Sequence, residues 1–113
     1  MDYRKEYEKW LASPALSEDE RAELKALEGN DKEIKARFYG PLEFGTAGLR
    51  GTMYTGLHNM NRHVIRWATQ GFANVIRAEG EEAMKKGVAI CMDCRNHWME
   101  FARAAACVMA GNG

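Results

Sequence analysis

The sequence has no apolar run long enough to cross a membrane, since no stretch approaches the ~18 residues that a span requires. Its first six residues, MDYRKE, are mostly charged where a signal peptide would turn apolar. No charge of one sign dominates, because 16 Lys and Arg residues balance 16 Asp and Glu residues. A chain without net charge exerts no general attraction on nucleic acid or on an acidic membrane surface. We therefore expect a cytoplasmic protein without nucleic-acid or membrane partners, in which any anion site is local.

Cysteine is scarce, and the three residues are Cys91, Cys94 and Cys107. An odd number in a chain without a secretion signal is typical of free thiols in a reducing compartment. Cys91 and Cys94 have the C-x-x-C spacing of redox pairs, but such pairs open a helix, whereas Cys91 belongs to an apolar, strand-like run. A zinc site from Cys94 and His97 would need a second closely spaced pair of ligands, which the sequence lacks. We expect the thiol of Cys91 to pack as a small apolar group.

Three short helices are expected in residues 1–40. Aromatic and apolar residues recur at steps of three and four over residues 3–11, and a Ser-Pro pair ends this first helix. Ser17 and Glu20 have the spacing of a capping box, which begins a second helix, and Asn30 is placed to cap a third. The mixed charges on these helices indicate solvated faces, so we assign this segment no chemistry.

Residues 41–113 combine amphipathic helices with short apolar runs. The period of the apolar residues predicts a helix of roughly five turns over residues 61–80 and another over residues 98–111. Between them, Val88–Met92 is a nearly continuous apolar run, as in a parallel strand covered on both faces. Residues 49–54 are predicted to form a short strand, although the glycine within them weakens it.

The order of these elements indicates an α/β fold. A strand, a polar loop and a helix make half of a βα repeat, and ligands of open α/β sheets bind beyond the carboxyl ends of the strands. We expect an incomplete α/β/α domain in residues 41–113, with a small, mainly parallel sheet flanked by helices, preceded by the helical segment 1–40. A two-stranded parallel sheet is rarely stable alone. We therefore expect a truncated piece of a larger protein that self-associates to cover its open edge or exposed helix faces.

The stretch Phe44–Gly51, FGTAGLRG, is the plainest candidate site in the chain. Its three glycines allow positive φ and a close approach to a ligand, and Arg50 offers a planar fork of hydrogen-bond donors. This combination suits a phosphate. The alternative is a glycine-rich turn that leads into a strand, with an incidental arginine, because short glycine motifs also arise without function.

Further motifs follow this stretch in a fixed order: NMN at 59–61, TQG at 69–71, DCRNH at 93–97 and FAR at 101–103. With the stretch itself, they resemble the α-D-phosphohexomutases, the phosphoglucomutase/phosphomannomutase family. The helices of residues 1–40 resemble the branch that contains bacterial phosphoglucomutases and phosphopentomutase-like members. The similarity covers nearly the whole chain.

This resemblance implies an enzyme of four domains that moves a phosphate between the 1-position and the 5- or 6-position of a sugar. A phosphorylated serine, in a Thr-Ala-Ser-His-Asn-Pro-like loop downstream of Gly113, would exchange the phosphoryl group, and Mg²⁺ would neutralise the developing charge. We therefore expect the 113 residues alone to be inactive and to bind no metal. The partners of the whole enzyme would be a sugar phosphate and the remaining mutase domains. The alternative is a stand-alone phosphate-binding or assembly module without catalysis.

Five residues match the family's active-site loops and are our candidates for binding phosphate or substrate. Thr46, Gly48 and Arg50 match the first loop, where the arginine lies near the phosphoserine and the bound phosphate. Asp93 and Arg95 match the loop after the second strand. For each arginine the alternative is a structural salt bridge, such as one between Arg50 and Asp93.

Three positions near these loops have open interpretations. His97 opens a helix and could meet a phosphate, but a helix-capping or solvated histidine is the simpler interpretation. Many relatives have an arginine where Asn59 stands, so this departure removes a contact to a phosphate or carboxylate. A small residue or serine is common where Trp98 stands, so the second departure puts a bulky ring beside the expected site.

Overall fold

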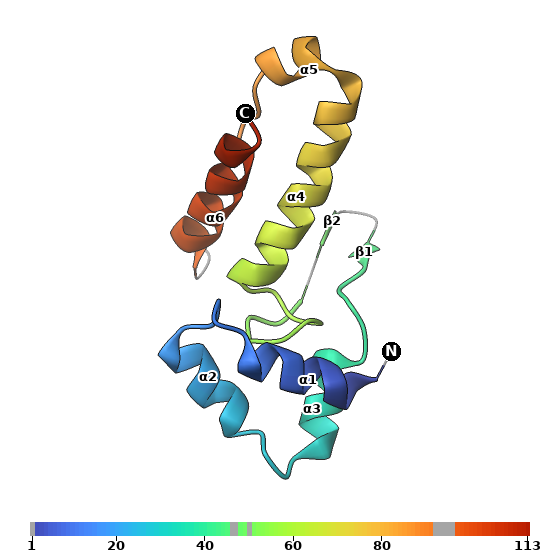
Figure 1. Cartoon of the computed structure of the whole chain (residues 1–113), viewed down its shortest axis with the longest axis vertical. Coiled ribbons are helices and arrows are strands. Elements are labelled where there is room, and N and C mark those ends of the chain that lie inside the picture. Colours follow the sequence, from blue (N-terminus) through green and yellow to red (C-terminus); the bar gives the residue numbers. More distant parts are fainter. Residues whose placement is uncertain (1, 46–47, 50, 92–96) are drawn as a thin grey trace. The chain divides into compact units, whose positions relative to one another are not determined.

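The computed structural model describes residues 2–45, 48–49, 51–91 and 97–113. Within these ranges the chain is mostly helical, with six helices and two strands of two residues each (Figure 1). It divides into two compact units, Met1–Asn61 and Arg62–Gly113. The expected segments 1–40 and 41–113 stay a prediction, because compactness alone does not test where a domain begins.

The first unit contains the three helices predicted for its amino-terminal part: α1 (Tyr3–Ala12), α2 (Glu18–Lys25) and α3 (Asp31–Phe38). The capping box is confirmed, since Ser17 Oγ accepts the N–H of Glu20 at 3.3 Å and the Glu20 carboxylate accepts the N–H of Ser17 at 3.0 Å. The cap of α3 is also confirmed, because Asn30 Oδ1 accepts the N–H of Glu33 at 3.3 Å. Short polar side chains at these positions satisfy backbone donors that the helices leave unpaired.

The core of the first unit is built around Phe38 and Leu24, whose side chains are completely buried. The rings of Tyr7 and Trp10 meet Phe38 edge-on, each with its centroid 5.7 Å away. Leu57, from the loop before α4, joins the same cluster. The Tyr7 hydroxyl donates a hydrogen bond to the Leu24 carbonyl at 2.8 Å, and burial raises the pKa of that hydroxyl. The α1–α3 segment and the later loop therefore share one core.

The Gly-rich stretch forms the only ladder among the described residues, between β1 (Phe44–Gly45) and β2 (Gly48–Leu49). The ladder is antiparallel, so the expected mainly parallel sheet is not present in these ranges. The predicted strand over residues 49–54 is wrong for residues 51–54, which are not in a strand. Its backbone closes a loop instead, because the Thr52 carbonyl accepts the N–H of Tyr54 at 3.1 Å and of Met60 at 2.8 Å.

The second unit contains α4 (Arg62–Glu79), α5 (Glu81–Lys85) and α6 (Trp98–Gly111). The two long helices confirm the predicted ones and lie side by side (Figure 1), whereas α5 occupies the expected polar connection. Asn112, just after α6, exchanges two hydrogen bonds of 2.9 and 3.0 Å with the Gln70 side-chain amide. None of the described helices has the length and apolar composition that crossing a membrane requires.

The expected strand Val88–Met92 is not seen as a strand in the described part of the chain. Residues 88–91 have no regular structure, with Val88 42% and Ile90 38% exposed, and Met92 lies outside the described residues. An apolar run becomes a strand only when a neighbouring strand pairs with its backbone. No described residue provides that partner. On α4, the apolar side chains of Phe72 and Val75 are likewise more than half exposed.

Candidate phosphate-binding site

The β1–β2 ladder pairs Phe44 with Leu49 and Gly45 with Gly48. Gly48 has φ +119°, a backbone conformation that residues with side chains rarely adopt, so glycine is required there. Gly51 serves a different purpose. A Cβ on it would lie 3.0 Å from the Leu42 side chain and 3.4 Å from the Met60 nitrogen. Glycine thus allows the unusual backbone conformation at residue 48 and the close approach of residue 51 to Leu42 and Met60.

Of the five predicted site residues, the structure describes Gly48 alone. Thr46, Arg50, Asp93 and Arg95 lie outside the described residues, as does the alternative salt bridge from Arg50 to Asp93. The phosphate site therefore stays a prediction, and the backbone conformation of Gly48 is the one part of it that the structure describes.

His97 directly precedes α6 with φ +63°, in the left-handed region. Its side chain does not cap the helix. Its Nδ1 lies instead 3.1 Å from the Glu100 carboxylate, and its ring lies 5.9 Å from that of Phe101, centroid to centroid. A protonated His97 would form an ion pair with Glu100 on an exposed helix end. The solvated interpretation of this histidine therefore fits better than the capping one.

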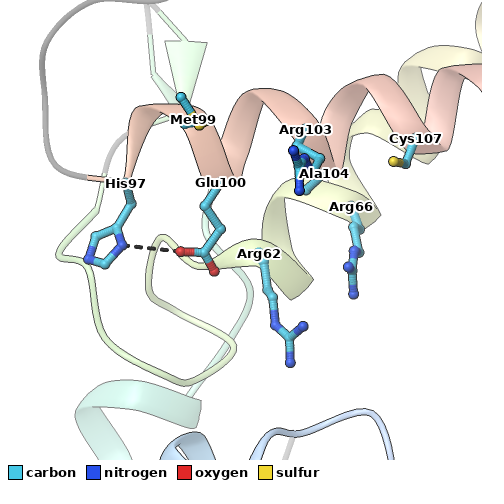
Figure 2. A pocket seen from close by; sticks show the side chains of 8 residues that line it. All are labelled: Arg62, Arg66, His97, Met99, Glu100, Arg103, Ala104 and Cys107. Atoms are coloured by element: carbon cyan, nitrogen blue, oxygen red, sulfur yellow. Dashed lines mark hydrogen bonds and ion pairs between the residues drawn. The ribbon is translucent and has the colours of Figure 1, made fainter.

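A pocket lies between α4 and α6 in the second unit (Figure 2). Its volume is about 650 Å³, and its lining consists of Arg62, Arg66, His97, Met99, Glu100, Arg103, Ala104 and Cys107. The described residues of this lining include three guanidinium groups and one carboxylate. Guanidinium groups gathered around a hollow attract anions.

The arginines of this pocket come from both helices. Arg62 and Arg66 are one turn apart on α4 and extend together on one side of it, whereas Arg103 projects from α6 (Figure 2). The side chains of Arg66 and Arg103 are exposed, and neither guanidinium has a hydrogen-bond or ion-pair partner among the residues that the structure describes. The sequence interpretation missed this cluster, although the four-residue spacing of Arg62 and Arg66 was a visible signal.

The described residues give limited information on metal and redox chemistry. No three His, Cys, Asp or Glu side chains in those ranges lie close enough to hold a metal ion. Cys91 and Cys107 are free thiols and exposed, so Cys91 does not pack as the apolar group we expected. Cys94 lies outside the described residues, and the C-x-x-C pair is not tested.

Comparison with known proteins identifies the class of the domain. Residues 41–113 match the family model described as "Phosphoglucomutase/phosphomannomutase, alpha/beta/alpha domain I". This match spans both the Gly-rich stretch and residues 93–97. The chain therefore belongs to the phosphoglucomutase/phosphomannomutase family, and the resemblance to the phosphohexomutases is confirmed.

Individual relatives are sugar phosphomutases of several kinds. The chain is 37% identical over 92 residues to a phosphopentomutase of Pongo abelii, covering 76% of this chain and 15% of that protein. It is 31% identical over 112 residues to a phosphomannomutase of Mycoplasma genitalium, covering 97% of this chain and 20% of the relative. A phosphoglucomutase of Staphylococcus saprophyticus is 34% identical over 83 residues, which cover 74% of this chain and 14% of that protein. The chain thus spans a fifth or less of these relatives. No solved structure matches it significantly.

Proposed function

We propose that the chain forms part of domain I of a sugar phosphomutase, which moves a phosphate between the 1-position and the 5- or 6-position of one sugar. The match of residues 41–113 to the family's domain I carries this proposal. The relatives are a phosphopentomutase, a phosphomannomutase and a phosphoglucomutase, so their names agree in the reaction and differ in the sugar. The proposal therefore names the reaction and leaves the sugar open.

The proposed reaction needs a phosphoserine. This residue gives its phosphoryl group to a hydroxyl of the sugar phosphate, and the bisphosphorylated sugar then reorients and returns its other phosphate to the serine. The two serines of this chain have structural roles instead. Ser17 caps α2, and Ser13 Oγ accepts the N–H of Ala15 at 3.2 Å. We therefore place the nucleophile in another part of the enzyme and expect no turnover by the 113 residues alone.

Thr46, Gly48 and Arg50 are proposed to line one side of the phosphate site, and Asp93 and Arg95 another. The guanidinium of Arg50 would bind two phosphate oxygens through parallel hydrogen bonds and stabilise charge in the transition state. A carboxylate repels phosphate, so Asp93 would orient a guanidinium and not touch the ligand. The conformation of Gly48, which excludes a side chain, supports this placement.

Mg²⁺, which the family resemblance implies, would neutralise charge on the transferred phosphate in this reaction. The ion prefers oxygen ligands in octahedral geometry, among them one or two carboxylates. Among the described residues, no three His, Cys, Asp or Glu side chains are grouped to hold a metal ion. We propose that Mg²⁺ is held by other domains and that this chain supplies no ligand.

The Val88–Met92 run is proposed to become a parallel strand in the complete domain. Its apolar composition and the exposure of Val88 and Ile90 support this proposal, since a buried parallel strand needs apolar side chains on both faces. Amide hydrogen exchange tests it. Residues 88–91 should exchange rapidly in the isolated chain and slowly in a longer chain that contains the rest of domain I.

A cytoplasmic location is also proposed. It is supported by the exposed free thiols of Cys91 and Cys107, because such thiols persist in reducing compartments. Fractionation of the source cells, followed by detection of the chain with an antibody, tests this location.

Two measurements on the purified 113 residues test the proposed function. A coupled assay should detect no conversion of glucose 1-phosphate to glucose 6-phosphate, and measurable turnover would show that the nucleophile lies in this chain. Titration with inorganic phosphate, followed by ¹⁵N NMR, should shift amides in residues 45–50 and 93–97. The Arg50→Gln variant should lose these shifts. Shifts confined to remote surfaces would contradict the site assignment.

The second candidate is a module that holds a phosphate without catalysis, and the α4–α6 pocket is the observation that favours it. The same titration separates the two candidates. Saturable shifts centred on Arg62, Arg66 and Arg103, without shifts in the Gly-rich stretch, would support the module. An Arg66→Gln/Arg103→Gln variant should then lose binding, whereas Arg50→Gln should retain it.

A further inference from the structure

A cluster of three charged side chains, of which only Arg37 is buried, lies between α2 and α3. Arg37 is the one buried charged residue in the described ranges, with 7% of its surface exposed. Its Nε donates to the Glu33 carboxylate at 3.0 Å, and its Nη1 lies 3.6 Å from the Glu23 carboxylate. A buried guanidinium needs such partners, because removing it from water is otherwise costly.

The same two helices bind one residue of the loop 52–61. Arg37 Nη1 donates to the Thr55 carbonyl at 3.2 Å, and the Glu23 carboxylate accepts the Thr55 N–H at 3.1 Å. The Tyr54 ring centroid lies 4.8 Å from the Arg37 guanidinium carbon. The backbone carbonyl of Arg37 also accepts the N–H of His58 at 2.8 Å. Arg37 and Glu23 therefore hold both backbone groups of Thr55.

Two buried asparagines close the loop from inside. Asn61 Nδ2 donates to the carbonyls of Tyr54 at 3.0 Å and Gly56 at 2.8 Å, while Asn59 Oδ1 accepts the Thr52 hydroxyl at 2.9 Å. Gly56 has φ +143°, and a Cβ on it would lie 2.9 Å from Arg37 Cβ. These hydrogen bonds close the loop, and Gly56 packs directly against α3.

The ends of this loop meet where the Gly-rich stretch ends. The Thr52 carbonyl accepts the Met60 N–H at 2.8 Å, directly after Gly51, which packs against Leu42 and Met60. We propose that Glu23 and Arg37 are positioning residues, which fix the loop 52–61 and through it the end of the Gly-rich stretch at Gly51. This inference rests on the proposed function. Both residues precede the part of the chain that matches the family domain, so the match gives them no role.

Four variants of the full 113-residue chain test the inference. Glu23→Gln removes one charge at nearly constant size, Arg37→Gln replaces the guanidinium by a shorter neutral amide, and Arg37→Lys restores the charge. Arg4→Gln is the matched control, because it removes an exposed ion pair to Asp31 on the surface of α1. Amide shifts of Gly48, Gly51 and Thr55 are first compared without phosphate. Inorganic phosphate is then titrated into each variant.

We expect Arg37→Gln to move all three amides and to weaken phosphate binding by about tenfold or more, because glutamine loses the charge-assisted hydrogen bonds that hold the loop at Thr55. Arg37→Lys should recover part of the affinity, and Arg4→Gln should change it by less than about twofold, as for an exposed pair. A folded Arg37→Gln with unmoved Gly48 and Gly51 amides would overturn the inference. If that variant does not fold, the amide shifts of Gly48 and Gly51 in Glu23→Gln test the inference instead. If the wild type binds no phosphate, the proposed function fails, while the phosphate-free amide shifts still decide the role of Arg37.

Discussion

Gly48 in the Gly-rich stretch and Asn59 in the loop 52–61 show how local structure limits which amino acid can occupy a position. Gly48 is held at a positive φ that side chains disfavour, within a ladder of two residues per strand. Asn59 is 5% exposed and bonded to Thr52 within the loop. Its Nδ2 also donates to the Thr55 carbonyl at 3.4 Å, so both ends of the amide bind groups of the loop. Asn59 is therefore a structural residue in this chain.

At Gly48, substitution by alanine should destabilise the chain by about 1–2 kcal/mol, because the native φ is strained for any residue with a Cβ. Urea denaturation followed by NMR intensities of the first unit measures the change. Gly71→Ala is the matched control. Gly71 lies inside α4, where an added Cβ would meet open space, so alanine should stabilise by about 0.5–1 kcal/mol. Equal urea midpoints for Gly48→Ala and the wild type would mean that the positive φ is not maintained in solution.

At the scale of elements, the helices of the first unit are determined by local signals. Each begins at a polar residue whose side chain accepts a backbone N–H, namely Asp2, Ser17 and Asn30. These interactions span only two or three residues, and a sequence shows them directly. The helix α2 ends at Lys25, and the chain then turns toward Gly29, which has φ +85°.

Removing the cap of α2 should destabilise the first unit. Ser17→Ala loses the hydroxyl that accepts the Glu20 N–H, which typically costs about 1 kcal/mol. For a domain of this size the melting temperature should fall by roughly 4–8 °C, as measured by circular dichroism. Ser17→Asp keeps an acceptor at the same place and should melt near the wild type. If alanine and aspartate have the same effect, the capping hydrogen bond does not contribute.

The packing of α1 on α2 should weaken in alkaline solution. Burial, and next the charge of Glu28, raise the pKa of the Tyr7 hydroxyl above its ordinary value of about 10. The fold therefore favours the neutral hydroxyl, and its contribution is complete below the ordinary pKa and is lost as the pH rises through the raised one. Urea midpoints measured between about pH 8 and pH 11 should fall more for the wild type than for Tyr7→Phe. Parallel falls would show that Tyr7 is not responsible.

At the scale of the molecule, the features that depend on residues close together in the sequence were predicted correctly. The features that depend on contacts between distant residues were missed. The periodic helices were found from residues a few positions apart, and the ordered motifs identified the family. The Val88 run was predicted as a strand, but strand formation depends on a partner elsewhere. Balanced composition likewise concealed the pocket of Arg62, Arg66 and Arg103, because only the packing of α4 against α6 brings these charges together. The Glu23–Arg37 cluster was invisible for the same reason.

The exposed apolar side of α4 leads to a prediction about assembly. Trp67, Phe72 and Val75 are 60%, 54% and 58% exposed, and Phe72 and Val75 lie on one face of the helix. Burying such side chains is worth about 1.5–3 kcal/mol each, so a second copy of the chain is expected to cover them. Light scattering after size exclusion should give a mass above that of one chain, and the mass should rise with concentration.

The variant Phe72→Gln/Val75→Thr should weaken this association by at least about tenfold, because it removes most of the apolar area that two copies would share. Met53→Gln is the control, since Met53 is an exposed apolar residue of the first unit, 43% exposed and outside α4. It should leave the mass unchanged. A well-folded wild type that stays monomeric at every concentration would contradict the prediction. Equal dissociation by Met53→Gln would instead place the contact on the first unit, away from α4.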